Sequence, residues 1–422
     1  LSAKSEDAYE ELKVFSDVIE LIEKEYVDEV ETKELIQKAI QGMVQSLDPH
    51  SSLLPQEAFE DLQIDTKGKF TGIGIHITMR DGFVTVISPI EDTPAHKAGI
   101  KARDKIIKVD GKPTKDLREA VNMMRGPKGT PVAVTILREG VKQPLEFELV
   151  RDVIPIQSVK SIMLKPGYGF IRLSNFTGTT TTEMEKALRK LESSKDPLKG
   201  LVLDLRNNGG GLLNQSLKVT DLFLDEGKIL SIKGRNSKNT KEFNASASSE
   251  KRSYPLVVLI NAGSASASEI VAGALQDHKR ALILGTTSFG KGSVQTVETL
   301  RDGSGLKLTI ARYYTPNGRS IQAKGIEPDI FLEHRLLDPA ESRSKEDGLL
   351  KEKDLENHLE AESNEKQDKE DDGDEENQEK SRRQEVEFRV GPLKPEMLQT
   401  DNQVMRALEL LEGYEIFKNF KS

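Results

Sequence analysis

Between residues 156 and 332, apolar strand-like runs alternate with helical patterns. Buried strands are expected at Gly169–Leu173, Gly200–Leu205, Leu256–Ile260, Ala281–Leu284 and Leu306–Tyr313. Helices are expected between them at Thr181–Leu191, Leu213–Leu224 and Ala267–Gln276. Such alternation is typical of α/β layering, in which helices cover the faces of a sheet. The fold class predicted for this region is therefore α/β, with a mixed sheet flanked by helices.

The regions on either side differ in composition and predict a multi-domain chain. Between residues 69 and 152, turn signals such as Asp81-Gly82 and Asp110-Gly111 separate short β-type runs. These runs are Gly74–Ile77, Phe83–Ile87, Lys105–Val109, Val132–Leu137 and Leu145–Val150, and a helix is expected among them at Leu117–Met124. Residues 365–380 are almost all charged or polar, and such a segment cannot bury enough apolar surface to offset the entropy of ordering. A solvated linker is the preferred interpretation there, with a partner-binding acidic tail as the alternative. The predicted segments are N-terminal helices at 1–68, a small β-rich domain at 69–152, the α/β core at 153–332, a disordered acidic linker at 333–384 and a C-terminal helical segment at 385–422.

Composition and charge exclude several classes of protein. With 61 Lys and Arg against 70 Asp and Glu, the net charge is −9, which argues against a nucleic-acid partner. No apolar run approaches the roughly 18–20 residues of a membrane-spanning helix. The chain has no cysteine, so disulfides, a thiol nucleophile and thiolate metal sites are excluded.

The same features bear on location. Absence of cysteine suits an oxidising compartment, and the first residue is Leu1, which indicates either a removed signal peptide or a truncated start. We therefore expect a secreted or periplasmic protein, with membrane association through an absent N-terminal segment as a further option.

Three loops carry residues suited to chemistry, and each adjoins a predicted strand. The first contains Gly209, Gly210 and Gly211, and glycines after a strand let backbone N–H groups point at an anion or a developing oxyanion. No Gly-Lys-Ser or Gly-Lys-Thr follows, so a nucleotide-phosphate loop is disfavoured.

The second and third loops offer a nucleophile and a base. Ser264, Ser266 and Ser268 lie at a strand-to-helix turn, where one serine could cap the helix and another could do chemistry. These two interpretations have equal weight on local grounds. Lys291 stands between two glycines, and it is a surface charge unless burial depresses its pKa towards neutrality.

Over nearly its full length the chain resembles the C-terminal processing peptidases, also called tail-specific proteases. Residues 263–270 are similar to the family's nucleophile motif, with Ser266 as the attacking residue. Phe289–Gly292 is similar to the lysine motif, and Lys291 follows Ser266 by 25 residues, as in the family. The resemblance implies a serine endopeptidase with a Ser266–Lys291 dyad, an acyl-enzyme intermediate and Gln295 orienting the lysine. It also implies an oxyanion hole formed by the N–H of Ala267 and one glycine N–H, with Gly210 preferred. The resemblance further implies cleavage that needs no metal and no cofactor.

Residues 69–150 resemble a PDZ domain of the kind these proteases carry. The six residues similar to its carboxylate-binding loop are Phe70, Thr71, Gly72, Ile73, Gly74 and Ile75. Residues 92–100 and 104–111 are similar to the next stretches of that domain. In relatives an arginine of this domain helps to assemble the catalytic residues, and Arg125 is the candidate here.

The resemblance implies that the PDZ domain binds exposed C-terminal tails of unfolded or tagged proteins, which the protease core then cleaves. It further implies an activating adaptor as a partner, and the apolar faces of the terminal helices suggest a homodimer. Two alternatives stay open: a PDZ peptide-binding adaptor with a silenced protease domain, and a crotonase-like coenzyme A enzyme suggested only by the glycine loop.

Overall fold

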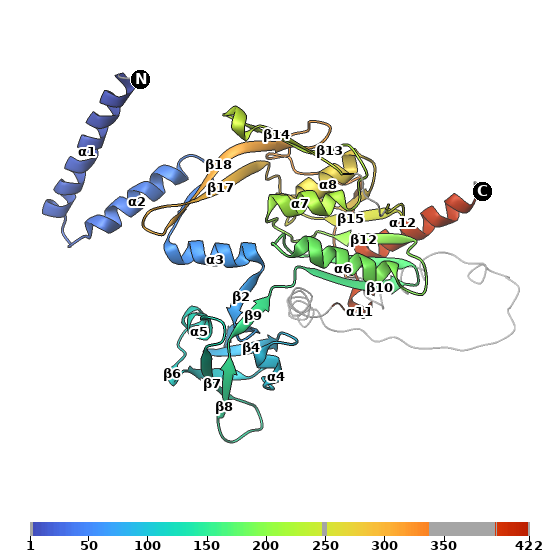
Figure 1. Ribbon diagram of the computed structural model, residues 1–422, viewed down its shortest axis with the longest axis horizontal. Coiled ribbons are helices and arrows are strands. Elements are labelled where there is room, and N and C mark those ends of the chain that lie inside the picture. Colours follow the sequence, from blue (N-terminus) through green and yellow to red (C-terminus); the bar gives the residue numbers. More distant parts are fainter. Residues whose placement is uncertain (1–2, 247–250, 337–392, 394, 421–422) are drawn as a thin grey trace, which may run out of the picture. The chain divides into compact units, whose positions relative to one another are not determined.

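The computed structural model describes residues 3–246, 251–336, 393 and 395–420 (Figure 1). Most of the predicted acidic linker, from residue 337 onward, lies outside these described residues. The chain divides into two compact units. Unit 1 contains Leu1–Gln63, Ser231–Lys241 and Gly292–Tyr313, and unit 2 contains Ile64–Leu230, Glu242–Lys291 and Tyr314–Ser422.

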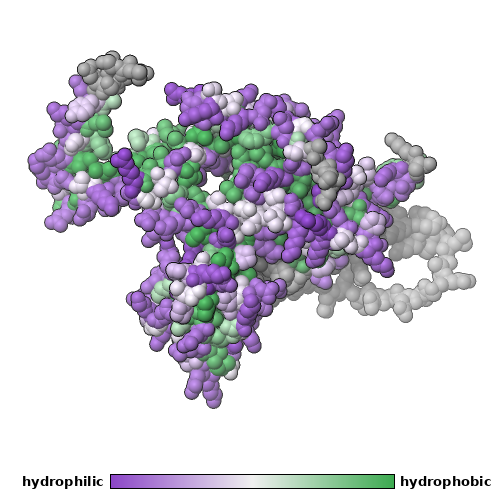
Figure 2. Space-filling view, in the orientation of Figure 1, coloured by the Kyte–Doolittle hydropathy of each residue, from purple (hydrophilic) through white to green (hydrophobic). Residues whose placement is uncertain are grey.

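Unit 1 combines N-terminal helices with strands of a five-stranded sheet. Its helices are α1 (Ala3–Glu25), α2 (Thr32–Gln45), the short 3₁₀-helix η1 (Ser237–Asn239) and α3 (Gln56–Lys67), which runs on into unit 2. Its sheet contains β1 (Ser52–Leu54), β17 (Ser293–Thr299), β18 (Gly305–Tyr314), β13 (Lys228–Gly234) and β14 (Lys241–Asn244). Of these, β13 begins in unit 2, and β14 and β18 end in it. The sheet order is β1-β18-β13-β14, and β17 pairs with β18. Apolar side chains lie exposed along α1, among them Leu12, Val14, Phe15, Val18 and Leu21 (Figure 2).

One predicted strand belongs to a different sheet from the one expected. The sequence places Leu306–Tyr313 in the α/β core, but β18 pairs antiparallel with β1 and β17 in unit 1. Most side chains of β18 are only partly buried, whereas the strands of a parallel core are buried on both faces. An apolar run alone does not distinguish these two environments.

The β-rich domain lies in unit 2. Its elements are β2 (Lys69–Gly72), β3 (Ile75–Arg80), β4 (Phe83–Pro89), α4 (Pro94–Lys97), β5 (Lys105–Val109), β6 (Lys112–Pro113), α5 (Leu117–Met124), β7 (Pro131–Leu137), β8 (Leu145–Val150) and β9 (Asp152–Pro155). The sheet order is β3-β4-β5-β7-β8, so β3 is an edge strand, and β2 pairs separately with β9. The expected strands 105–109 and 145–150 and the expected helix 117–124 are confirmed.

The α/β core, also in unit 2, has the predicted mixed sheet. Its elements are β10 (Val159–Lys165), β11 (Tyr168–Leu173), α6 (Thr180–Glu192), β12 (Gly200–Asp204), α7 (Leu213–Asp221), β15 (Leu256–Ile260), α8 (Ala267–Asp277), β16 (Leu282–Gly285), β19 (Ile330–Phe331), α11 (Pro395–Gln399) and α12 (Asn402–Asn419). The strand order is β10-β11-β12-β15-β16-β19; β10 is antiparallel to β11 and the other neighbours are parallel.

Helices cover both faces of this sheet. On one face, alternate strand residues such as Phe170, Val202 and Leu259 pack in one cluster with Val404 and Leu408 of α12. Residues one position along, such as 171, 203 and 258, are also fully buried and point to the other face, because side chains alternate along a strand. The helices α6, α7 and α8, which contact one another in that order, supply the second layer.

The topology brings the three chemical loops to one edge of the sheet. The strands β12, β15 and β16 are adjacent and parallel, so their carboxyl ends lie together. The glycine loop follows β12, the serine turn follows β15, and the lysine loop follows β16. The carboxyl edge of a parallel sheet is where ligands bind in open α/β folds. The core therefore places its candidate site there.

Candidate active site

Ser266 occupies a strained turn between β15 and α8. It is the N-cap residue of α8, with φ of 56° and ψ of −111°. This left-handed conformation is unfavourable for a residue other than glycine. Sharp strand-to-helix turns present nucleophiles at the N-terminus of a helix, where the helix dipole stabilises negative charge. The Ser266 side chain is partly exposed, so an incoming substrate could reach it.

The two flanking serines have structural roles. The Ser264 hydroxyl donates to the carbonyl of Leu205 at 2.8 Å, and the Ser268 hydroxyl donates to the carbonyl of Asn208 at 2.8 Å. Both side chains are fully buried. They bind the serine turn to the loop after β12, and Ser266 is the partly exposed serine of the three.

The glycine loop lies directly against the serine turn. The N–H of Ala265 donates to the Asn208 carbonyl at 3.0 Å. A Cβ on Gly210 would lie 2.9 Å from Cβ of Ser266 and 3.0 Å from the nitrogen of Ala267, and Gly210 has φ of 104°. Only glycine is accommodated at this position, because both the space and the backbone conformation exclude a side chain.

The two predicted oxyanion donors, the N–H groups of Ala267 and Gly210, lie close together but differ in their hydrogen bonds. Ala267 is the first residue of α8, so its N–H has no acceptor within the helix. The N–H of Gly210 donates to the Asn208 side-chain oxygen at 2.9 Å. Their joint role as an oxyanion hole stays a prediction.

The lysine loop is joined to the serine turn through one buried carboxylate. The backbone N–H groups of Ser266 and Lys291 both donate to Oε2 of Glu269, at 2.7 and 2.9 Å. The Ser288 hydroxyl and the N–H of Gly290 donate to Oε1, at 2.6 and 2.7 Å. Burial raises the pKa of Glu269, and the four hydrogen bonds offset part of that rise. The Lys291 side chain is partly buried.

Gln295 lies on β17, in unit 1. Its side-chain amide donates to the hydroxyl of Ser293 at 2.9 Å and to that of Thr309 at 3.2 Å. The Thr309 hydroxyl in turn donates to Asp48 at 3.1 Å. The predicted role of Gln295 towards Lys291 stays a prediction.

The predicted carboxylate-binding loop is partly a strand. Phe70, Thr71 and Gly72 belong to β2 and pair with β9, while Ile73 and Gly74 form the connection to β3, which begins at Ile75. Gly74 has φ of 81°, and a Cβ there would meet the side chain of Thr93 at 2.3 Å. The candidate sensor, Arg125, is the C-cap of α5, and its Cζ atom lies 5.8 Å from the centre of the Phe70 ring.

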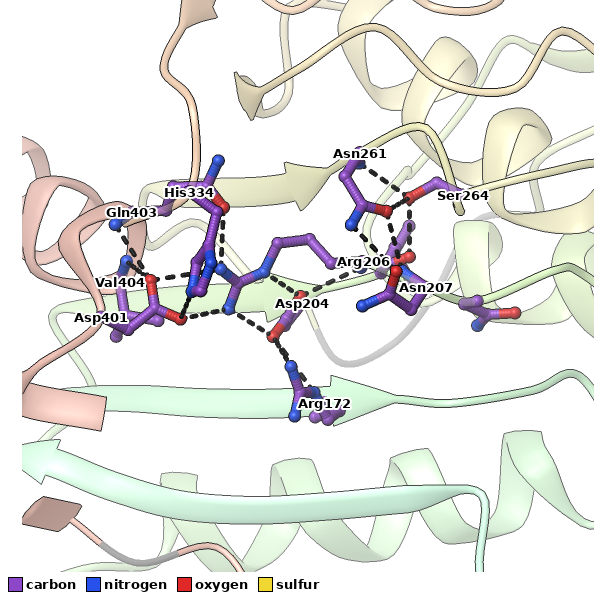
Figure 3. A network of polar contacts seen from close by, with 12 residues as sticks. Arg172, Asp204, Arg206, Asn207, Asn261, Ser264, His334, Asp401, Gln403 and Val404 are labelled. Atoms are coloured by element: carbon purple, nitrogen blue, oxygen red, sulfur yellow. Dashed lines mark hydrogen bonds and ion pairs between the residues drawn. The ribbon is translucent and has the colours of Figure 1, made fainter. Parts of the chain in front are cut away.

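A buried ionic network links the glycine loop to the C-terminal segment (Figure 3). The Arg206 guanidinium donates to Asp204 at 2.9 Å and forms an ion pair with Asp401 at 2.8 Å. Asp204 also pairs with Arg172 at 2.8 Å. This network was not predicted from the sequence, because Asp401 lies far from Arg206 along the chain and no local pattern marks either residue as a member.

Charge pairing shifts the acid–base behaviour of this network. Burial by itself raises the pKa of Asp204, but Arg172 and Arg206 outweigh it and hold that pKa below its ordinary value. Burial acts in the same direction on Asp401, where Arg206 and a hydrogen bond from His334 hold the pKa far below its ordinary value.

Within the described part of the chain, no group of three or more His, Asp or Glu side chains is placed to hold a metal ion. In that same part, no helix combines the length and the apolar character needed to cross a membrane.

Three family models match the chain. The model for peptidase family S41 matches residues 167–332, which contain the three loops of the candidate site. The PDZ-domain model matches residues 71–161, and the model described as the activating protease CtpB N-terminal domain matches residues 2–58.

Individual relatives extend these matches. The carboxy-terminal-processing protease of Bartonella bacilliformis is 47% identical over 358 residues, spanning 84% of this chain and 82% of that protein. The carboxy-terminal processing protease CtpA of Bacillus subtilis is 41% identical over 318 residues, spanning 74% of this chain and 67% of that protein. Among solved structures, the photosystem II D1 C-terminal processing protease is 33% identical, with coverage of 76% of this chain and 92% of its own and a TM-score of 0.44.

The identity to the Bartonella protein extends over most of both chains, and the matched families cover the α/β core and the β-rich domain separately. The fold class and the enzyme class expected from the sequence are confirmed. The chain belongs to the C-terminal processing proteases of peptidase family S41, which are serine-type peptidases, and it carries a PDZ domain.

Proposed function

We propose that Ser266 is the nucleophile of this protease and that Lys291 is its general base. The Ser266 hydroxyl oxygen bonds to the scissile carbonyl carbon while its proton passes to the neutral Lys291 amine. The protonated lysine then donates that proton to the leaving amine as the C–N bond breaks, which leaves an acyl-enzyme. Water, deprotonated by the same lysine, releases the acyl group and regenerates the serine.

One observation carries this assignment: Ser266 alone of the three clustered serines has a partly exposed side chain, in a strained turn at a helix N-terminus. The N–H of Ala267 supports the proposed oxyanion site, because it lies at the first turn of α8 without a helical acceptor. The Gly210 N–H is directed to Asn208, so its donation to an oxyanion would require the hydrogen bond to be shared or exchanged.

We further propose that the PDZ domain binds the substrate's C-terminal tail as an added strand. β3 is the edge strand of its sheet, and α5 contacts it, so a peptide could pair with β3 beside the helix. The connection at Ile73 and Gly74 lies at the beginning of β3, where the tail carboxylate would end.

We also propose a homodimer, an activating adaptor and a secreted or periplasmic location. The exposed apolar side chains of α1 support a homodimer through the N-terminal helices, and the match to an activating-protease domain in this region supports an activating adaptor. Absence of cysteine from all 422 residues supports a secreted or periplasmic location.

The decisive test of the dyad replaces each member. Ser266→Ala and Lys291→Ala should each abolish cleavage of casein or of a tagged peptide, while circular dichroism shows an unchanged fold. Wild-type protein should be labelled at Ser266 by a serine-reactive phosphonate. Near-normal turnover by Lys291→Ala would refute the base assignment, and a wild-type protein that binds tails without labelling would be an adaptor with a silenced site.

A further inference from the structure

Glu269 is a buried carboxylate for which the dyad mechanism has no stated use. It is the third residue of α8, and its side chain is fully buried. Four donors converge on its two oxygens, all within 2.9 Å. A buried carboxylate with this many charge-assisted hydrogen bonds holds the groups around it in a fixed arrangement.

The donors belong to the two loops that carry the dyad. Oε2 accepts from the backbone N–H groups of both Ser266 and Lys291. Oε1 accepts from Gly290 and from Ser288, which lie just before Lys291. One oxygen atom thus joins the peptide units of the nucleophile and the base, although 25 residues separate them in the chain.

We propose that Glu269 is a positioning residue for catalysis: its carboxylate sets the separation of the Ser266 and Lys291 backbones and so places the two reacting side chains. This inference rests on the proposed dyad. The carboxylate itself touches no substrate, because it is fully enclosed by the protein.

A purely structural explanation competes with this one. A glutamate at the third helical position often accepts from the N-cap N–H and so stabilises the helix start, which contributes about 1 kcal/mol to stability. That explanation covers only the bond from Ser266. It gives no reason for the bonds from Ser288, Gly290 and Lys291, which come from the loop after a different strand.

The variant Glu269→Gln separates these explanations with little change in shape. An amide offers one acceptor oxygen and one NH₂ group, so it cannot accept from backbone N–H groups on both sides. If the amide oxygen keeps the bonds from Ser266 and Lys291, the amide NH₂ faces the N–H of Gly290, and two donors meet. In the reverse orientation, the NH₂ faces the N–H groups of both Ser266 and Lys291, and these two bonds are lost. We expect kcat to fall about 100-fold, as a displacement near 1 Å can cause. KM for a tailed substrate should be unchanged, because tail capture depends on the PDZ domain.

Glu183→Gln is the matched control. Glu183, on α6, also accepts from two backbone N–H groups, those of Ser158 and Val159, at 2.8 and 3.1 Å, and from the Ser158 hydroxyl at 3.1 Å. It lies in the same domain but outside the three loops of the site. This variant should lose stability while keeping its kcat at temperatures where it is folded.

The measurements are kcat, KM, the rate of phosphonate labelling at Ser266, and thermal unfolding by circular dichroism. A folded Glu269→Gln protein with wild-type kcat and labelling rate would overturn the proposal, as would a loss of kcat no larger than that of Glu183→Gln.

If Glu269→Gln does not fold, Ser288→Ala replaces it, since this removes one bond to Oε1. A folded Ser288→Ala with reduced kcat supports the proposal, and wild-type kcat overturns it. Activity in Ser266→Ala would instead refute the dyad itself. Failure of the proposed dyad is thus distinguished from failure of the proposed role of Glu269.

Discussion

Ser266 adopts a backbone conformation that costs of order 1–3 kcal/mol for a residue with a side chain. Such strain persists only where neighbouring contacts determine the conformation. Here the flanking residues Ser264 and Ser268 are bound to the loop after β12, and the N–H of Ser266 is bound to Glu269. The polar contacts of the turn therefore fix the backbone of Ser266, the proposed nucleophile, before substrate arrives.

Gly210→Ala tests how closely the glycine loop must approach this turn. The added methyl group would lie 2.8–3.0 Å from atoms of Ala265, Ser266 and Ala267, at a φ that alanine rarely adopts. We expect the loop to move away and kcat to fall by at least about 10-fold. The measurement is steady-state cleavage of a tagged peptide.

Gly209→Ala is the control for that change. A Cβ at Gly209 has no atom within 4 Å, and its φ is not in the left-handed region, so this variant should keep much more of its activity. Equal activity in the two variants would show that the Gly210 contact does not matter for turnover.

The helix α12 covers one face of the core sheet, and its N-cap residue belongs to the buried ionic network around Arg206. Asp401 is the N-cap of α12 and accepts from the N–H groups of Gln403 and Val404. The same carboxylate pairs with Arg206, which precedes the glycine loop. A helix near the C-terminus is thereby attached to a loop of the candidate site.

Asp401→Ala should destabilise the protein by about 3–5 kcal/mol, because it leaves Arg206 buried without one of its partners and removes a helix cap. Denaturant unfolding followed by circular dichroism measures this loss. The control is Glu409→Gln, which removes an exposed pair with Arg406 on the same helix and should change stability little. Comparable losses in the two variants would contradict a structural role for the network.

The same carboxyl gives a pH dependence with a definite sign. The pKa of Asp401 is lower in the folded state than its ordinary value of 3.8, so the ionised form stabilises the fold. This contribution is complete above the unfolded pKa and is lost as pH falls below about 4. Free energies of unfolding measured from pH 6 downward should show it, and Asp401→Asn should fall less steeply over the same range. An identical slope in the variant would exclude this linkage.

The PDZ domain, proposed to capture tails, and the α/β core, proposed to cleave them, are separate folds of one chain. The PDZ domain has its own hydrophobic core, which includes Val86, Ile106 and Val134. The three loops of the candidate site all belong to the α/β core. Changes in tail recognition should therefore act on KM, whereas changes in the three loops should act on kcat.

Amidation of the substrate's C-terminal carboxyl should raise KM for a tailed peptide and leave kcat near its normal value, because the loop before β3 would bind the carboxylate. Gly74→Ala should have the same effect, since its Cβ would collide with Thr93. Gly82→Ala is the control: Gly82 has a similar positive φ of 76° in open space. Peptide-cleavage kinetics distinguish these variants, and a KM insensitive to amidation would contradict carboxylate capture.

The sequence by itself determined the main strands and helices of both domains and the order of their motifs, but it did not predict β2, β9 or β10. Strand and helix periodicity depends on local backbone geometry, so the expected α5, β5, β8 and β15 agree with the structure residue for residue. The motifs around Ser266 and Lys291 were recognisable because each is a short contiguous stretch. Local reasoning could not separate Ser264, Ser266 and Ser268, since all three are good caps, and only the resemblance to the family's motif singled out Ser266.

Only the tertiary structure decided which groups meet. The parallel pairing of β12, β15 and β16 brings three loops together, and the buried positions of Ser264 and Ser268 leave Ser266 partly exposed. Glu269 holds two loops through one oxygen, and Asp401 pairs with Arg206 from a remote part of the chain. These contacts arise from long-range packing and the desolvation of polar groups, neither of which has a periodic signal in the sequence.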